Sequence, residues 1–318
     1  MKPGYPMLRN LLDKFGIYVA FMVMVLLFAI LSPNFFSARN ISNIMVQSSI
    51  LAIIAIGQTI VILTSGIELS VGSVAGFTSM LSAYLVVVSG LPVSVSIFIS
   101  LIAAGFIGFI NGAFVTYAKL PAFIVTLGTM SIARGAALAL TEGAPISGVP
   151  KSYEVLASTD LFGVVPIFIL YCLVAYVLAY VFLTYTKSGR YIYALGGNRE
   201  AARLSGIKVR AIELLAYVIC GTLSGIGGVM LTARLAYATP IAGMGYELDV
   251  IAAAVIGGTS LFGGEGTILG TLVGAIMLGT LRNGLTLLGV SPYFQAIIIG
   301  IVIILAVFFD RIRSKRGS

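Results

Sequence analysis

Histidine and tryptophan are absent from this sequence, and charged residues are scarce. Without histidine the chain lacks the commonest metal ligand and the usual proton shuttle near neutral pH. Without tryptophan, any aromatic belt at a membrane interface must be built from tyrosine. Only 9% of the 318 residues are charged, 59% are hydrophobic and the mean hydropathy is +1.10. Because soluble domains are about 25% charged, most of this chain must face something other than water.

A phosphate-binding lysine is missing as well. Each of the seven lysines follows a residue other than glycine, so the chain has no Gly-Lys-Ser/Thr loop and cannot hydrolyse ATP in the usual P-loop way. An intramembrane enzyme would need a nucleophile with a base, or a metal site. The cysteines, Cys172 and Cys220, lie in apolar runs, where a thiol behaves as a small hydrophobic group. We therefore expect no catalysis and no bound cofactor or metal.

Long apolar runs are what the sequence does have. A hydrocarbon core roughly 30 Å thick needs about 20 apolar residues per helical crossing. The runs cover residues 16–31, 44–63, 71–88, 93–117, 122–140, 164–183, 212–233, 250–261, 268–288 and 294–309. We predict a single all-α membrane domain over residues 1–318, with about ten transmembrane helices.

The basic residues indicate how the chain is oriented. With ten crossings, fourteen of the nineteen Lys and Arg residues fall at one side together with both termini. Because Lys and Arg gather in cytoplasmic loops, this predicts a multi-pass protein with both termini cytoplasmic. The net charge of +8 is thereby explained, and we expect no nucleic-acid partner.

Two loops are long enough to have roles of their own, 141–163 outside and 184–211 inside. The outer loop carries Glu142, Glu154 and Asp160 against one lysine, so either a soluble partner docks there or the loop is only solvated.

Two of the runs are interrupted. The eighth passes through Gly257, Gly258, Gly263, Gly264 and Gly266, and the second ends in the break 64–72. Interrupted helices at corresponding places in two halves indicate a repeat around a transport path. We therefore expect an internal repeat that could be inverted.

Polar residues inside the runs are the candidates for lining such a path, since polar groups in a bilayer must pair or face water. They are Gln47, Gln58, Asn111, Thr126, Arg134 and Asn283. Neutral amides and hydroxyls suit a polyhydroxylated cargo because they donate and accept without a fixed charge. For each one, a hydrogen bond between helices is the competing interpretation. Arg134 and Arg282 cannot lose their protons, so an ion pair or a carbonyl contact is the simplest prediction for both.

Glycines four residues apart indicate close helix packing. They occur as Gly108 and Gly112, as Gly221 and Gly225, and as Gly266, Gly270 and Gly274.

The inner loop holds the clearest local pattern, Leu195-Gly-Gly-Asn-Arg-Glu-Ala-Ala-Arg-Leu-Ser-Gly-Ile207. Gly196 and Gly197 favour a sharp turn, Asn198 is a good helix N-cap, and Gly206 ends a short helix over 200–204. We expect a small helix against the cytoplasmic face that offers Ala201, Ala202, Leu204 and Ile207 to a partner.

Taken together, these stretches resemble a permease of the ribose-type sugar ABC importers, over nearly the whole chain. The resemblance is carried by Leu31-Ser-Pro-Asn-Phe-Phe36, Ile62-Leu-Thr-Ser-Gly-Ile-Glu-Leu-Ser-Val-Gly-Ser73, Ser188-Gly-Arg-Tyr-Ile-Tyr-Ala-Leu-Gly-Gly-Asn198, Gly245-Tyr-Glu-Leu-Asp249, Ile256-Gly-Gly-Thr-Ser260 and Gly263-Gly264.

The resemblance implies a non-catalytic permease subunit in the bacterial inner membrane that imports a monosaccharide, with ribose as the first expectation. It implies a separate ATPase that binds ATP and Mg, a soluble sugar-binding protein, and a second permease copy or paralogue within the lipid. In such importers a Glu-Ala-Ala pattern followed by glycine docks into the ATPase. By that pattern the coupling residues are Gly197, Asn198, Glu200, Ala201, Ala202 and Gly206.

An ion-coupled secondary transporter is the alternative. It would need an ionisable carboxylate deep in the membrane. Glu68, Glu247, Asp249 and Glu265 map to breaks or helix ends, which weakens this alternative.

Overall fold

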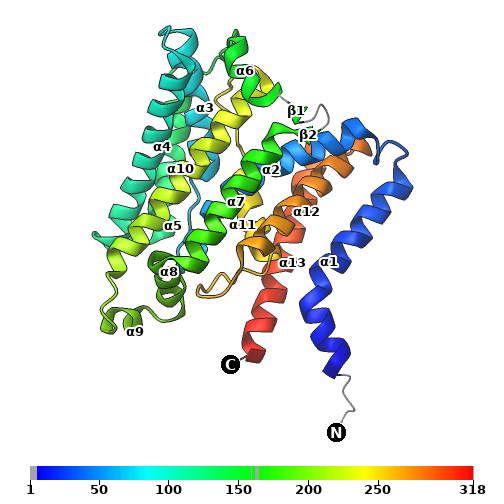
Figure 1. The fold of residues 1–318 in the computed structure, drawn as a ribbon, viewed down its shortest axis with the longest axis vertical. Helices are drawn as coiled ribbons and strands as arrows, with labels where there is room; N and C mark the ends of the chain where they lie inside the picture. Colours follow the sequence, from blue (N-terminus) through cyan, green and yellow to red (C-terminus); the bar gives the residue numbers. More distant parts are fainter. Residues whose placement is uncertain (1–5, 159, 162–164, 318) are drawn as a thin grey trace.

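The computed structural model describes residues 6–158, 160–161 and 165–317, and its regular structure is almost entirely helical (Figure 1). The elements are α1 (Pro6–Leu31), α2 (Ala38–Leu63), α3 (Val71–Val87), α4 (Val93–Thr116), α5 (Ala122–Ala139), α6 (Lys151–Ser158), β1 (Asp160–Leu161), β2 (Val165–Pro166), α7 (Ile167–Tyr185), α8 (Lys187–Gly197), α9 (Arg199–Leu204), α10 (Val209–Leu235), α11 (Tyr246–Ile256), α12 (Ile268–Leu287) and α13 (Pro292–Gly317). The two strands form one antiparallel pair.

Each of the ten apolar runs overlaps a helix, and the all-helical prediction is confirmed. Within the described residues, six helices are long and apolar enough to cross a membrane: α2, α4, α5, α7, α10 and α12. Shorter apolar stretches lie in α1, α3 and α13. The eighth run forms only α11, of 11 residues, because the chain turns at Gly257 and then at Gly258, which has φ +88°.

Two long helices, α2 and α10, form the centre of the bundle. Most of α2 is buried by other parts of the chain, and so is more than half of α10. They cross where Gly57 lies against Cys220: a Cβ on Gly57 would stand 2.7 Å from the Cys220 Cα. Both cysteines are buried and free, as expected for small hydrophobic groups.

Small residues bring the other helices against this centre, which confirms the packing predicted from the glycine spacing. Gly221 of α10 meets Ala104 and Gly108 of α4, and a Cβ on Gly274 of α12 would overlap the Ala253 carbonyl of α11. Hydroxyl pairs add to the packing, Thr59 with Thr271 at 2.8 Å and Ser79 with Thr232 at 2.7 Å. Close backbone approach and hydroxyl pairing are how helices associate in lipid.

The two long loops lie at opposite ends of the molecule. Figure 1 shows α8 and α9 at the end where α1 starts and α13 finishes, with α6 and the strand pair at the other end. The outer loop is more than a solvated connector, because Tyr153 of α6 is fully buried and its hydroxyl lies 2.8 Å from Ser82 Oγ of α3. Glu154 is half-buried, and Glu142 is exposed.

Non-helical segments interrupt the bundle in two places. Residues 64–70 lead into α3, and residues 236–245 lead into α11. The second runs inward from the outer loop, where Ala238 pairs with Ile146, to Gly243, which lies against Gly72 of α3. The segments 64–70 and 257–267, which the sequence suggested as corresponding breaks, touch each other: the Ser65 hydroxyl donates to the Phe262 carbonyl at 2.8 Å.

Candidate functional site

The short helix α9 is built as the sequence predicts. Asn198 caps it by accepting a hydrogen bond from the Ala201 amide at 2.9 Å, and Gly206 follows it with φ +81°. Such caps satisfy the amides and carbonyls that a helix terminus leaves unpaired. Without these two residues a helix of 6 residues would not hold its shape.

One face of α9 is free for a partner. Glu200 and Arg203 form an exposed ion pair at 2.5 Å, in which the hydrogen bond from Arg203 lowers the pKa of Glu200. Leu204 is 74% exposed, a large apolar side chain beside charged ones. Ala202 is buried against the body of the protein, so the expectation that it is available to a partner is wrong. Its methyl group packs α9 against the rest of the bundle.

A buried carboxylate anchors α9 to the bundle. Arg199 donates two hydrogen bonds to Glu213 of α10, at 3.0 and 2.6 Å, and this pairing raises the pKa of Arg199. Bidentate pairs of this kind fix orientation as well as adding energy. Sequence reasoning missed Glu213, because a carboxylate at the edge of an apolar run gives no indication of its distant partner.

A basic cavity lies beside this ion pair. It has a volume of about 470 Å³ and is lined by Val115, Thr116, Lys119, Arg199, Arg203, Val209, Arg210 and Glu213. Arg199 and Arg203 are already in ion pairs, so Lys119 and Arg210 are the lining cations that make the cavity suited to an acidic group.

Asn111 of α4 is hydrogen-bonded to two other segments. Its amide nitrogen donates to Glu68 at 2.7 Å and lies 3.2 Å from the Ser70 hydroxyl, while its carbonyl accepts from Thr129 at 2.5 Å. All of these except Thr129 are fully or nearly fully buried. A carboxylate buried in this way is stable only when donors satisfy it. Asn111 therefore joins α4 to the break before α3 and to α5.

Three other predicted residues also have bonds within the protein. Arg134 of α5 donates to the carbonyls of Pro240 and Ala242. Asn283 of α12 donates to Asn40 of α2 at 2.8 Å, and Thr126 donates to the Ala122 carbonyl of its own helix at 2.9 Å. The simple predictions for the two arginines are confirmed, since Arg282 forms an ion pair with Asp249 at 2.7 Å.

Gln58 of α2 is the exception. It is completely buried, and neither polar atom of its amide has a hydrogen-bond partner in the structure. A buried amide without a partner costs about 1–3 kcal/mol, so Gln58 is ready to bond a water or a ligand. Gln47, on the same helix, is half-buried. Among the described residues, no hydrogen bond joins two of the six path candidates directly.

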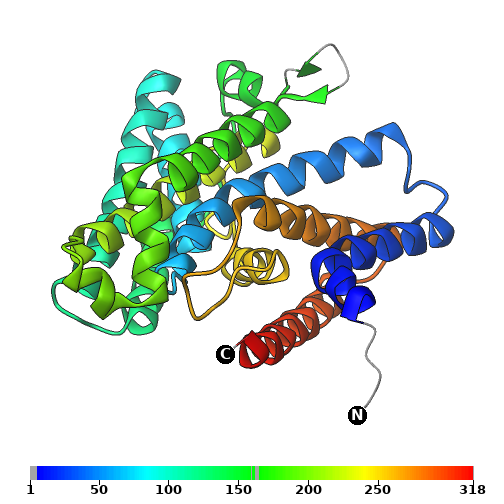
Figure 2. The same cartoon turned by 60° about the horizontal axis from the view of Figure 1, so that its bottom comes forward.

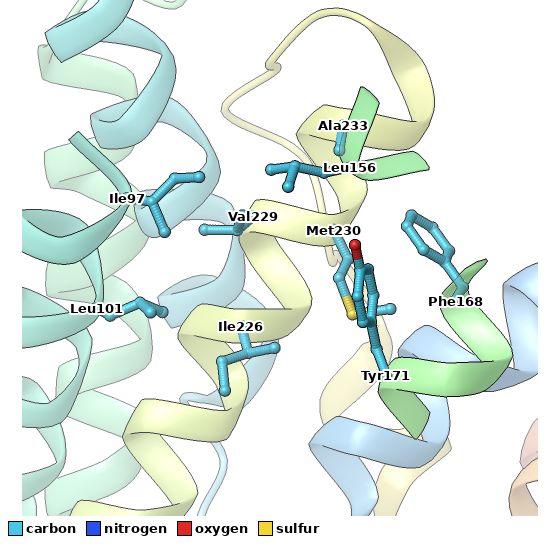
Figure 3. A pocket seen from close by; sticks show the side chains of 9 residues that line it. All are labelled: Ile97, Leu101, Leu156, Phe168, Tyr171, Ile226, Val229, Met230 and Ala233. Atoms are coloured by element: carbon cyan, nitrogen blue, oxygen red, sulfur yellow. The ribbon is translucent and has the colours of Figure 1, made fainter. Parts of the chain in front are cut away.

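A separate groove does not suit a polar cargo. It lies between α4, α7 and α10, has a volume of about 200 Å³, and is drawn in Figure 3. Its lining residues are Ile97, Leu101, Leu156, Phe168, Tyr171, Ile226, Val229, Met230 and Ala233. Only the Tyr171 hydroxyl among these side chains could bond a sugar, and none of the path candidates takes part.

No group of three acidic, cysteine or histidine side chains that could hold a metal ion occurs in the part of the chain that the structure describes.

Comparison with known proteins places these features in a family. The profile described as "Branched-chain amino acid transport system / permease component" matches residues 40–307. The chain is 44% identical to the ribose import permease protein RbsC of Escherichia coli K12, over 92% of each chain. It is 43% identical to the protein of the same name in Bacillus subtilis 168, over 96% and 95% of the two chains. The D-allose transport system permease protein AlsC of E. coli K12 is 38% identical over 95% and 93%. No solved structure matches.

Proposed function

Since the chain belongs to the family of branched-chain amino acid transport system permease components, we propose that it is the membrane-spanning subunit of an ATP-driven importer whose cargo is ribose. The choice of ribose rests on two relatives named ribose import permease, at 43–44% identity, against 38% for the relative named for D-allose. The family profile and these relatives cover almost the whole chain, so the proposal concerns the complete bundle.

The observation that carries the proposal is the α8–α9 loop. It offers an exposed Glu200–Arg203 pair and an exposed Leu204 on a capped helix that is firmly anchored through Arg199 and Glu213. Small rigid surfaces with one apolar anchor and a polar rim are typical of docking sites. We place the ATPase here, over residues 184–211, with an acidic group of the ATPase against the basic cavity. ATP and Mg would bind to that subunit, and this chain would bind no cofactor.

We further propose ten crossings, with α11 and the non-helical segment 236–245 before it forming one interrupted span, and both termini in the cytoplasm. Support comes from the six long helices and the three shorter apolar ones, and from the basic residues beside α8 and α9. The similar arrangements before α3 and α11 favour an inverted repeat, because a Glu-Leu-x-Val sequence begins at Glu68 and again at Glu247.

The remaining partners are assigned by exposure. The soluble sugar-binding protein is placed over α6 and the outer loop, where Glu142 is exposed. A second permease copy or paralogue is placed against α5, whose Ile124 and Ile132 are 62% and 72% exposed, with membrane lipid covering the outward faces of α4 and α7.

For the path itself, Gln58 is the candidate best suited to meet a sugar hydroxyl, because its amide has no partner in the protein. Asn111, Arg134 and Asn283 are proposed to hold the path walls in place, since their bonds join helices. Gln47 and Thr126 remain path candidates. The ion-coupled alternative is not favoured, because the carboxylates of Glu68, Glu213 and Asp249 all have partners within the protein.

The test is uptake of radiolabelled ribose by cells that lack their own ribose transport and are supplied with this permease, its ATPase and its binding protein. Glu200→Ala should lower uptake about ten-fold, the factor expected when one strong interface contact is lost. Permease levels in the membrane are the control. Absence of ribose uptake by the unaltered chain would contradict the cargo, and full uptake by the variant would contradict the docking role of Glu200.

A further inference from the structure

Three segments far apart in the sequence meet beside the α8–α9 loop. They are the end of α2 (residues 63–65), the end of α8 (193–197) and the loop between α11 and α12 (262–266), which we call the junction. The Gly264 amide donates to the Leu63 carbonyl at 3.0 Å, and the Tyr193 hydroxyl donates to the Gly266 carbonyl at 3.1 Å. Figure 2 shows this end of the molecule, with the α11–α12 loop lying alongside α8 and α2.

Backbones touch directly at the junction. A Cβ on Gly196 would overlap the Leu63 carbonyl oxygen and the Gly264 amide. A Cβ on Gly264 would stand 2.7 Å from the Gly197 nitrogen. The expected role of Gly196 and Gly197 in a sharp turn is therefore wrong, because both belong to the last turn of α8. The small size of Gly196 allows the backbones at Leu63 and Gly264 to approach it closely. Close-packed contacts of this kind transmit displacement because they barely compress.

Ser65 lies at the centre of the junction. It has φ +64°, in the left-handed region that glycine adopts at no cost and serine adopts with strain. Its hydroxyl donates to the Phe262 carbonyl at 2.8 Å, and the Gly196 carbonyl lies 3.4 Å away. Glycine would fit this backbone better but could not make these bonds. A non-glycine residue in a strained backbone conformation motivates the hypothesis that its side chain has a functional role.

Short stretches of chain connect the junction to α9 and α12 and to the region around Glu68. One residue, Asn198, separates Gly197 from α9. Beyond Ser65 the chain reaches Glu68, whose bond to Asn111 carries the connection to α4 and α5. Beyond Phe262 it reaches α12. A displacement of α9 therefore acts on both interrupted regions at once.

We propose that Ser65 is a positioning residue for energy coupling, which fastens the end of α8 to the breaks after α2 and after α11 so that all three move together. This rests on the proposed function, since it assumes that a partner ATPase moves α9.

The test uses the complete complex of permease, ATPase and binding protein in proteoliposomes, with sugar uptake and ATP hydrolysis measured together. Ser65→Gly removes the hydroxyl and relieves the backbone, so the thermal midpoint should not fall. Sugar transported per ATP hydrolysed should drop about five-fold, the factor that one lost hydrogen bond typically carries. Ser65→Ala, which keeps the strained backbone, should show the same drop. Ser89→Gly, at an exposed turn near the opposite end, is the matched control and should leave the ratio unchanged.

An unchanged ratio in Ser65→Gly would overturn the proposal, and so would an equal loss of uptake and hydrolysis with a lowered midpoint, which indicates a merely structural role. Failure of the proposed function is distinguishable, because the unaltered complex would then transport no ribose at all.

Discussion

Asn111 shows what a single polar side chain does inside this bundle. It satisfies Glu68 on one side and accepts from Thr129 on the other. Replacing it with alanine leaves a buried carboxylate with fewer donors and a hydroxyl without an acceptor. Because unsatisfied buried groups cost about 1–3 kcal/mol each, Asn111→Ala should lower the free energy of unfolding by about 2–4 kcal/mol.

Thermal unfolding of the detergent-solubilised protein measures this change. Thr126→Ala is the matched control, since Thr126 is equally buried but bonds only within its own helix, and its midpoint should fall by a much smaller amount. Equal falls in the two variants would contradict the bridging role of Asn111.

At this scale the sequence identifies which residues need partners and not which partners they find. Arg134 and Arg282 are recognisable as charges within apolar runs, and an ion pair or a carbonyl contact follows from the chemistry of guanidinium. The Arg134 partners lie 106 and 108 residues further along the chain, beyond any local pattern. Gln58 is visible as an amide, but that it lacks a partner is a property of the packed structure.

Among the elements, the contact of α4 with α10 depends on glycine. Gly108 lies against the backbone of Tyr217, where an added Cβ would overlap the carbonyl oxygen. Gly108→Ala should therefore destabilise the protein by about 1–3 kcal/mol, the usual cost of overpacking.

Gly300→Ala on α13 is the same chemical change in open space, because no atom lies within 4 Å of the added Cβ. Its thermal midpoint should hold or rise slightly, since alanine favours a helix over glycine. Equal losses of stability in the two variants would contradict the overpacking explanation, because helix propensity alone favours alanine at both positions.

Element prediction succeeds where one signal dominates and fails where two compete. The long apolar runs form helices because hydropathy over such lengths is unambiguous, whereas the shorter run 250–261 is helical only as far as Ile256. By contrast α8 was not expected, because Gly189, Gly196 and Gly197 within 11 residues suggest turns. Thr186 starts this helix by capping the Gly189 amide, and Gly189 and Gly196 allow close contacts with neighbouring backbone. The cap of α9 was predictable because Asn198 and Gly206 act locally.

For the whole molecule, the decisive question is which side of the membrane each end occupies. The proposed ten crossings put α9 in the cytoplasm, and the turns before α4 and α13 outside. Ser89 and Tyr293 lie at those outer turns and are exposed, as is Leu204 on α9. Cysteine at each position is readable against a low background, because the native Cys172 and Cys220 are buried.

We expect a membrane-impermeant maleimide to label Ser89→Cys and Tyr293→Cys in intact spheroplasts, and Leu204→Cys only after the membrane is permeabilised. The reason is parity: an even number of crossings separates the two outer turns, and an odd number separates each of them from α9. Labelling of Leu204→Cys in intact spheroplasts would show that the protein has the opposite orientation in the membrane. Labelling of Ser89→Cys but not of Tyr293→Cys would mean that α11 and the segment 236–245 before it do not cross the membrane. Removing that one crossing moves every later turn to the opposite side.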